Sequence, residues 1–220
     1  IKQFKNSFTQ NLRTRDLALS ELKTVFNFAI EYEYIQTMPK FDRIPKSKKR
    51  KNVLTIEVAR DIISFIHNPI YKACFELLAI YPIRPSELRT LQWQDVNYNK
   101  KSITIRRHAS DNIVIEGRKS LSSGHDKASI TYPLTKNAER ILKELPVIGL
   151  KKSDYIFRGS RGEFISQNVL PRIWRKACKD AKIPFVSAYE IKHARLSEIA
   201  EKTNGDIVKM MDASGHTNPT

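Results

Sequence analysis

The feature that most constrains the fold is a basic segment at residues 37–52, which interrupts the helix-forming pattern of the chain. Its two prolines remove backbone donors and disfavour helix at the residues before them. No apolar periodicity runs through it, and residues 46–51 place five cations in six positions. We therefore expect an extended linker between two separately folded units, at 1–36 and 53–220.

The charge of the chain indicates a polyanionic partner. Its 220 residues carry 39 Lys plus Arg against 23 Asp plus Glu, a net charge of +16. Nucleic acid is the usual partner of a chain with such a surplus of positive charge. The sequence shows no basic amphipathic anchor helix of the kind typical of lipid-binding proteins. It also has no apolar run long enough to cross a membrane. The linker cations are predicted to lie along a phosphate backbone: Lys46, Lys48, Lys49, Arg50 and Lys51.

The cysteines and histidines favour neither disulfides nor metal ligands. Cys74 and Cys178 both lie in apolar helical contexts, as buried thiols do in a reducing compartment, so a cytoplasmic location is expected. The five histidines lack the spacing of zinc ligands, and no metal or cofactor is expected. Because the sequence begins with Ile1 and not with an initiator Met, and its first residues do not resemble a signal peptide, we expect a fragment of a longer protein.

Hydrophobic periodicity predicts a mainly α chain with a small antiparallel β-sheet, an α+β fold, because helices and strands do not alternate as in a parallel sheet. Helices are expected over about 15–36 and 70–81, and from Thr55, Pro85, Thr135, Ser166, Ser187 and Asn204. Strands are expected at 102–106 and 155–157, with a hairpin bracketed by 113–115 and 129–132. Ser187 and Glu190 are spaced as a capping box.

Three ordered segments carry candidate chemistry. In the first, Arg84 precedes a Pro-Ser-Glu-Leu run, and a Leu, a Trp and an Asp follow. Taken without the rest of the segment, Arg84 and Glu87 could form an ordinary surface ion pair. In the second, a spacing of three puts Tyr189, Lys192 and Arg195 near one helical face. In the third, a short apolar helix ends in Gly-His at position 216.

Together these segments resemble the catalytic domain of the tyrosine site-specific recombinases, the phage-type integrases, over 53–220. Residues 1–36 resemble the C-terminal part of the family's helical core-binding (SAM-like) domain. The resemblance implies that Arg84 grips the scissile phosphate, which suits a planar guanidinium. It implies that a hairpin lysine, Lys127 or alternatively Lys119, protonates the leaving 5′ oxygen, and that His216 hydrogen-bonds a non-bridging oxygen.

The chain departs from the family pattern in the second segment. Tyr189 stands where the family has His, and Lys192 stands where it has Arg, which keeps the charge and loses the bidentate fork. Arg195, one turn further on, is expected to contact DNA. The family's nucleophilic tyrosine follows the Gly-His segment, and none of the eight tyrosines occupies that position.

The resemblance implies site-specific recombination or integration of a phage or mobile element through a 3′-phosphotyrosine intermediate, without metal. The implied partners are duplex DNA and further recombinase subunits, assembled as a tetramer. Three alternatives stay open: a catalytically weakened DNA-binding relative, a type IB topoisomerase-like enzyme, and a basic RNA-binding or nucleoid protein.

Overall fold

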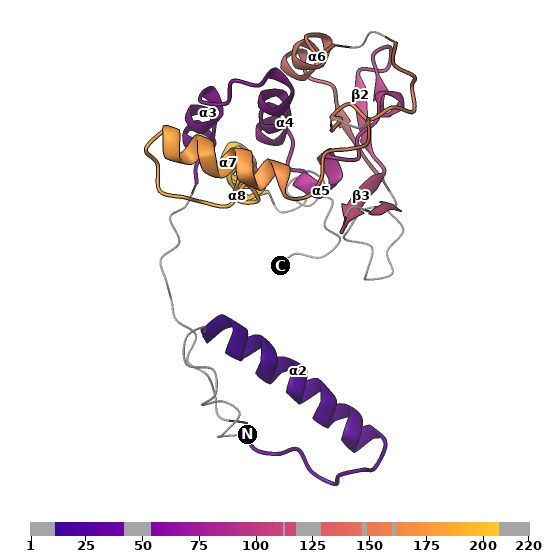
Figure 1. Ribbon diagram of the computed structural model, residues 1–220, viewed down its shortest axis with the longest axis vertical. Helices are drawn as coiled ribbons and strands as arrows, with labels where there is room; N and C mark the ends of the chain where they lie inside the picture. The colour runs from indigo at the N-terminus through magenta and orange to yellow at the C-terminus, as the bar shows by residue number, and fades with distance from the viewer. Residues whose placement is uncertain are drawn as a thin grey trace. The chain divides into compact units, whose positions relative to one another are not determined.

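The computed structural model describes residues 12–41, 54–111, 113–117, 129–146, 149–159 and 162–206. The chain forms two compact units, residues 1–51 and 52–220 (Figure 1). In the described part of the first unit, helix α2 spans Leu12–Glu31. The predicted end at residue 36 was wrong, because Glu33 adopts φ 58° and the Tyr34 N–H donates back to the Ala29 carbonyl at 2.8 Å, which closes the helix with a Schellman-type turn.

Six helices of the second unit lie in its described part, and side-chain caps fix several of their starts. They are α3 (Ile56–Ser64), α4 (Pro69–Ile80), α5 (Pro85–Leu88), α6 (Lys136–Lys143), α7 (Val169–Asp180) and α8 (Glu190–Lys202). Thr55 and Thr135 accept hydrogen bonds from the first turns of α3 and α6, as the sequence predicted. Ser166 does not cap α7, which begins at Val169 after Asn168. The predicted helix from Asn204 falls on residues 207–220, outside the described part of the chain.

The strands form two small antiparallel sheets, which confirms the α+β class but not the predicted hairpin. After the 3₁₀ turn η1 (Trp93–Asp95), one sheet has the order β1 (Val96–Asn97), β2 (Ser102–Ile105), β5 (Ile130–Pro133). The other pairs β3 (Arg107–Ser110) with β4 (Ile113–Glu116). The segments 113–115 and 129–132 therefore pair with different partners, and the predicted hairpin between them was wrong.

Strand β3 was missed because its sequence, Arg-His-Ala-Ser, lacks apolar alternation and is buried through specific polar contacts. The His108 Nδ1 lies 2.8 Å from the Gly117 carbonyl oxygen, and Arg107 pairs with buried Asp95. The strand predicted at 155–157 was also wrong, since only an isolated bridge joins Tyr155 to Gln92. Pairing of this kind depends on partners far along the chain, which local pattern does not reveal.

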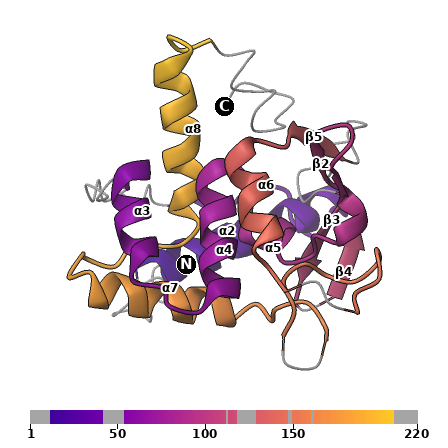
Figure 2. The same cartoon turned by 90° about the horizontal axis from the view of Figure 1, so that it is seen from above.

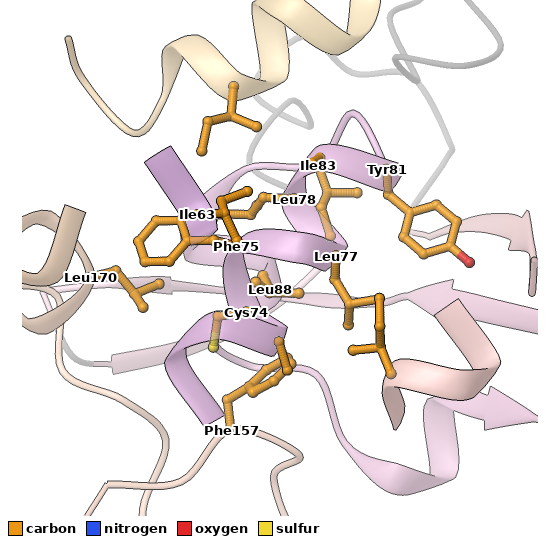
Figure 3. Packing of buried hydrophobic residues seen from close by; sticks show 14 of the residues in the cluster. Ile63, Cys74, Phe75, Leu77, Leu78, Tyr81, Ile83, Leu88, Phe157 and Leu170 are labelled. Carbon is orange, nitrogen blue, oxygen red and sulfur yellow. The ribbon is translucent and has the colours of Figure 1, made fainter. Parts of the chain in front are cut away.

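One hydrophobic core joins the helices of the second unit to its larger sheet, with α4 at the centre. Helix α4 packs against α3, α6 and α8, and Figure 2 shows it lying between α3 and α6. The Phe75 ring of α4 stacks on Trp174 of α7 with centroids 5.0 Å apart, and both side chains are completely buried. Figure 3 shows Phe75, Leu77 and Leu78 among residues of this core. The predicted buried thiols, Cys74 and Cys178, belong to it, and burial raises the pKa of both.

Tyr81 fixes the segment between α4 and α5. Its hydroxyl donates to the Pro133 carbonyl at 3.0 Å and accepts from the Thr135 N–H at 3.4 Å, so the end of α4 is attached to the end of β5 and the start of α6. Burial raises the pKa of Tyr81, which keeps the hydroxyl a donor. This attachment sets the backbone that leads to Arg84. Within the described residues, no helix has the length and apolar character needed to cross a membrane.

Candidate active site

Arg84 lies immediately before α5 and is held by the carboxylate of Glu87. Glu87 Oε2 accepts a hydrogen bond from the Arg84 backbone N–H at 2.9 Å, and Oε1 accepts one from the guanidinium at 3.2 Å. The Glu87 side chain is fully buried and that of Arg84 is 15% exposed. The interpretation as an ordinary surface pair was therefore wrong: a buried carboxylate orients both the backbone and the side chain of Arg84.

Arg84 lines a cavity of about 510 Å³. Four segments distant in sequence form its wall, namely the α5 region, the β3–β4 turn, the start of α7 and the residues before α8. The lining residues are Arg84, Pro85, Ser86, Arg89, Ala109, Ser110, Asp111, Gln167, Leu170, Pro171, Ser187, Ala188 and Tyr189. Of the residues predicted from sequence for the site, the cavity brings Arg84 and Tyr189 together.

The β3–β4 wall of this cavity is attached to the α5 region through Asp95. Asp95 accepts hydrogen bonds from the Gln92 N–H at 2.9 Å and from the Arg107 guanidinium, and Arg106 lies 3.2 Å away. The Asp95 carboxylate is almost completely buried and so is Arg107. Because a buried charge must be paired, this cluster fixes the start of β3 against the turn that follows α5. The Trp-Gln-Asp sequence after α5 thus positions the cavity wall.

Tyr189 lines the cavity just before α8, where the local structure differs from the predicted capping box. Ser187 Oγ accepts a hydrogen bond from the Tyr189 N–H at 3.2 Å, instead of capping the N–H of Glu190. The Tyr189 ring is 37% exposed and packs edge-on against His193, with centroids 5.0 Å apart. An exposed phenol at this position can donate a hydrogen bond to an anion in the cavity.

Lys192 and Arg195, on α8, do not line the cavity. Lys192 is 2% exposed and counts among the largest fully buried side chains of the described residues. Arg195 donates from Nε to the Ile80 carbonyl at 2.9 Å and pairs with Glu198, so it attaches α8 to the end of α4. Tertiary packing thus buries Lys192 and engages Arg195, so that of these three residues only Tyr189 lines the cavity, and the catalytic role of Lys192 stays a prediction. DNA contact by Arg195 stays a prediction.

Sequence reasoning did not select Arg89, which also lines the cavity. It is 4% exposed, and its guanidinium carbon lies 5.5 Å from the centroid of the Phe164 ring. Burial lowers its pKa. The neighbours of Arg89 in sequence, Ser-Glu-Leu before it and Thr-Leu-Gln after it, are largely polar, so the local sequence contained no signal that Arg89 is buried.

The remaining predicted residues lie outside the described residues, so their roles stay predictions. They are the hairpin lysines Lys119 and Lys127, His216, and the linker cations Lys46, Lys48, Lys49, Arg50 and Lys51. Across the part of the chain that the structure describes, no cluster of His, Cys, Asp or Glu is arranged to hold a metal ion.

Comparisons with known proteins agree on one family. Residues 52–220 match the model of the phage integrase family. A "Tyrosine recombinase XerC-like" protein of Caldanaerobacter subterraneus subsp. tengcongensis is 24% identical over 228 residues. That alignment covers 90% of this chain but only 57% of the relative, so the chain spans little more than half of that protein's length.

Two solved structures have the same fold as this chain. The Tn1549 transposon integrase superposes with a TM-score of 0.77 at 17% identity, over 98% of this chain and 75% of that one. A lambda integrase gives a TM-score of 0.67 at 20% identity, over 94% of this chain and 72% of that one.

Proposed function

The chain belongs to the phage integrase family, and from this membership we propose that it is part of a tyrosine recombinase that cleaves and rejoins duplex DNA at a specific site. A tyrosine oxygen attacks the phosphorus, the bond to the 5′ oxygen breaks, and a 3′-phosphotyrosine link forms. A general acid gives its proton to the departing 5′ oxygen. The 5′ hydroxyl of another strand then attacks this link, which releases the tyrosine and joins the strands.

The observation that carries the proposal is the support of Arg84 by Glu87 at the wall of the cavity. An arginine whose backbone and guanidinium are both held by a buried carboxylate is preorganised, so it loses little side-chain freedom when an anion binds. Its fork geometry matches two oxygens of a phosphodiester. Tyr189 supplies a hydroxyl donor at the same cavity. Lys127 as the general acid, Lys119 as its alternative and His216 as an oxyanion donor complete the proposed site.

Duplex DNA and further recombinase subunits are the proposed partners. The Tn1549 integrase was solved with transposon right end DNA, and lambda integrase was solved as a dimer on a core site and as a tetramer on a Holliday junction. The +16 charge of the chain suits the same polyanion. We propose that the linker cations contact the DNA backbone, that residues 1–36 belong to the core-binding domain, and that the protein acts in the cytoplasm on a mobile element.

A second candidate function is DNA binding without strand cleavage. It is favoured by the burial of Lys192, because a second cation that does not line the cavity is poorly placed to reach an anion there. Loss of one preorganised donor costs on the order of 10²–10³ in rate.

Covalent capture separates these functions. The full-length gene product is incubated with a duplex of its own site that carries a nick next to the cleavage position, so that the released oligonucleotide diffuses away. A recombinase accumulates a protein–DNA adduct that survives denaturation, and Arg84→Ala abolishes the adduct. If the intact protein binds the duplex and forms no adduct, the recombinase proposal fails and the DNA-binding relative stands.

A further inference from the structure

Arg89 is a buried cation for which the described structure offers no anionic partner. Its side chain lines the cavity and is 4% exposed. Among the described residues its Nε has no hydrogen-bond partner, and its guanidinium contacts the face of the Phe164 ring. Asp111 lines the same cavity, but no ion pair joins the two residues within the described ranges.

A guanidinium in this environment is costly without an anion. Removing an unpaired charge from water is unfavourable, and a cation–π contact offsets only part of that cost. Arginine also stays charged when its pKa falls, so it does not escape this penalty by losing its proton. An anion from outside the described residues would therefore be stabilised at this site.

The two arginines of the cavity flank one short helix. Arg84 immediately precedes the four-residue helix α5 and Arg89 immediately follows it. Arginine side chains are long, so two that line one cavity can reach the same phosphate-sized anion. Both line the same 510 Å³ cavity.

We propose that Arg89 is a second phosphate-binding guanidinium of this site, which contacts the same phosphodiester group as Arg84 from the floor of the cavity. The inference rests on the proposed function for the identity of the ligand. The second cation that contacts the phosphate is then Arg89, which lines the cavity, and not the buried Lys192. Arg84, held by Glu87, is fixed before binding, whereas Arg89 exchanges its contact with an aromatic face for a charge-assisted hydrogen bond.

Inorganic phosphate tests this assignment on the chain itself, without any DNA site. The Nε–Hε resonance of Arg89, assigned by its disappearance in Arg89→Met, should shift on phosphate addition and saturate with the same affinity as the resonance of Arg84. Arg89→Met should weaken phosphate binding about tenfold or more, the order expected for one charge-assisted hydrogen bond. Arg89→Lys should recover part of the loss because it restores the charge.

Arg175 is the matched control, since its guanidinium lies 5.0 Å from the centroid of the Phe185 ring but does not line the cavity. Arg175→Met should bind phosphate as the unmodified chain does, and the Arg175 resonance should not move. The assignment is overturned if the Arg89 resonance of the unmodified chain is insensitive to phosphate while that of Arg84 shifts, or if folded Arg89→Met binds normally. Should Arg89→Met not fold, the resonance in the unmodified chain still decides the question.

Failure of the proposed function gives a different result. If phosphate binds through Arg89 but the chain shows no affinity for duplex DNA, the anion site stands and the recombinase assignment falls. If the chain binds duplex DNA and the Arg89 resonance does not respond to phosphate, the assignment of Arg89 falls and the proposed function stands.

Discussion

Glu87 holds Arg84 twice, through the backbone N–H at 2.9 Å and through the guanidinium at 3.2 Å, and its own side chain is fully buried. The carboxylate therefore does more than neutralise a charge. It fixes the first residue before α5 and, through it, the direction in which the guanidinium enters the cavity.

Glu87→Ala should lower the free energy of unfolding by about 2–4 kcal/mol, because it removes hydrogen bonds to a charged group and leaves the guanidinium of Arg84 without its buried partner. Urea denaturation measures the change. Arg84→Ala and the double variant complete a cycle, and the double variant should cost less than the sum of the single variants. Additive effects would show that the two side chains do not depend on one another.

Binding of this chain to duplex DNA should weaken steeply with salt, because each phosphate contact releases condensed counterions. Replacing Lys46, Lys48, Lys49, Arg50 and Lys51 with Ala should reduce the slope of log affinity against log salt by up to about 4.5, at 0.9 per lost contact. Fluorescence anisotropy over a range of salt concentrations measures both slopes.

The control for the linker removes the same number of charges from exposed positions elsewhere: Lys100, Lys136, Lys151, Lys152 and Lys179. Its slope should change less than that of the linker variant. Equal slopes would indicate that net charge matters and the linker does not, and a preference for single-stranded RNA over duplex DNA would contradict the family's mode of binding.

Lys192 distinguishes a recombinase from a DNA-binding relative. If its ammonium reaches the phosphate when DNA binds, Lys192→Met should abolish covalent capture on the nicked duplex while it preserves most of the buried volume. Lys192→Arg adds a fork that could bind two oxygens, but it also enlarges a fully buried side chain. Urea denaturation of each variant separates lost chemistry from lost folding.

A folded Lys192→Met variant that forms the adduct normally would show that the second cation comes from elsewhere. Arg89 is then the residue to replace next, because it lines the cavity whereas Arg195 is engaged with Ile80 and Glu198.

Acid should weaken the attachment of α6 to the β1–β2 turn. Hydrogen bonds from Lys101 and Lys143 lower the pKa of Glu139 from 4.5 to about 2. Because the folded-state pKa lies below the unfolded one, the stabilisation is fully present above pH 4.5 and is lost as the pH falls towards 2. Glu139→Gln should therefore flatten the fall in unfolding free energy across this range, measured by urea denaturation at each pH.

The control on the same helix is Glu144→Gln, whose carboxylate forms an exposed pair with Arg140. Exposed pairs of this kind contribute little, so this variant should follow the pH profile of the unmodified chain. If both variants give the same profile, Glu139 is not the group that titrates.

The sequence alone determined the fold class, the helix starts at Thr55, Pro85 and Thr135, and Arg84 as a candidate site residue. These follow from short-range physics, because capping, proline geometry and apolar periodicity act within a few residues. The basic linker was predicted from composition in the same way, since charge and proline need no folded context to be recognised, and it stays a prediction because residues 42–53 lie outside the described part of the chain.

Only the tertiary structure decided which strands pair, which cations line the cavity and which are buried. Strand β3 pairs with β4, and Arg107 and His108 of β3 form buried polar contacts with Asp95 and Gly117. Apolar periodicity does not predict such contacts. On α8, a spacing of three suggested one face, yet Lys192 is buried and Arg195 is engaged by the Ile80 carbonyl at the end of α4. Arg89 lies among mostly polar neighbours in sequence, yet it is buried and lines the cavity directly after α5. A side chain's environment is set by segments far away in sequence, so the same residue pattern is compatible with a functional face or a packed one.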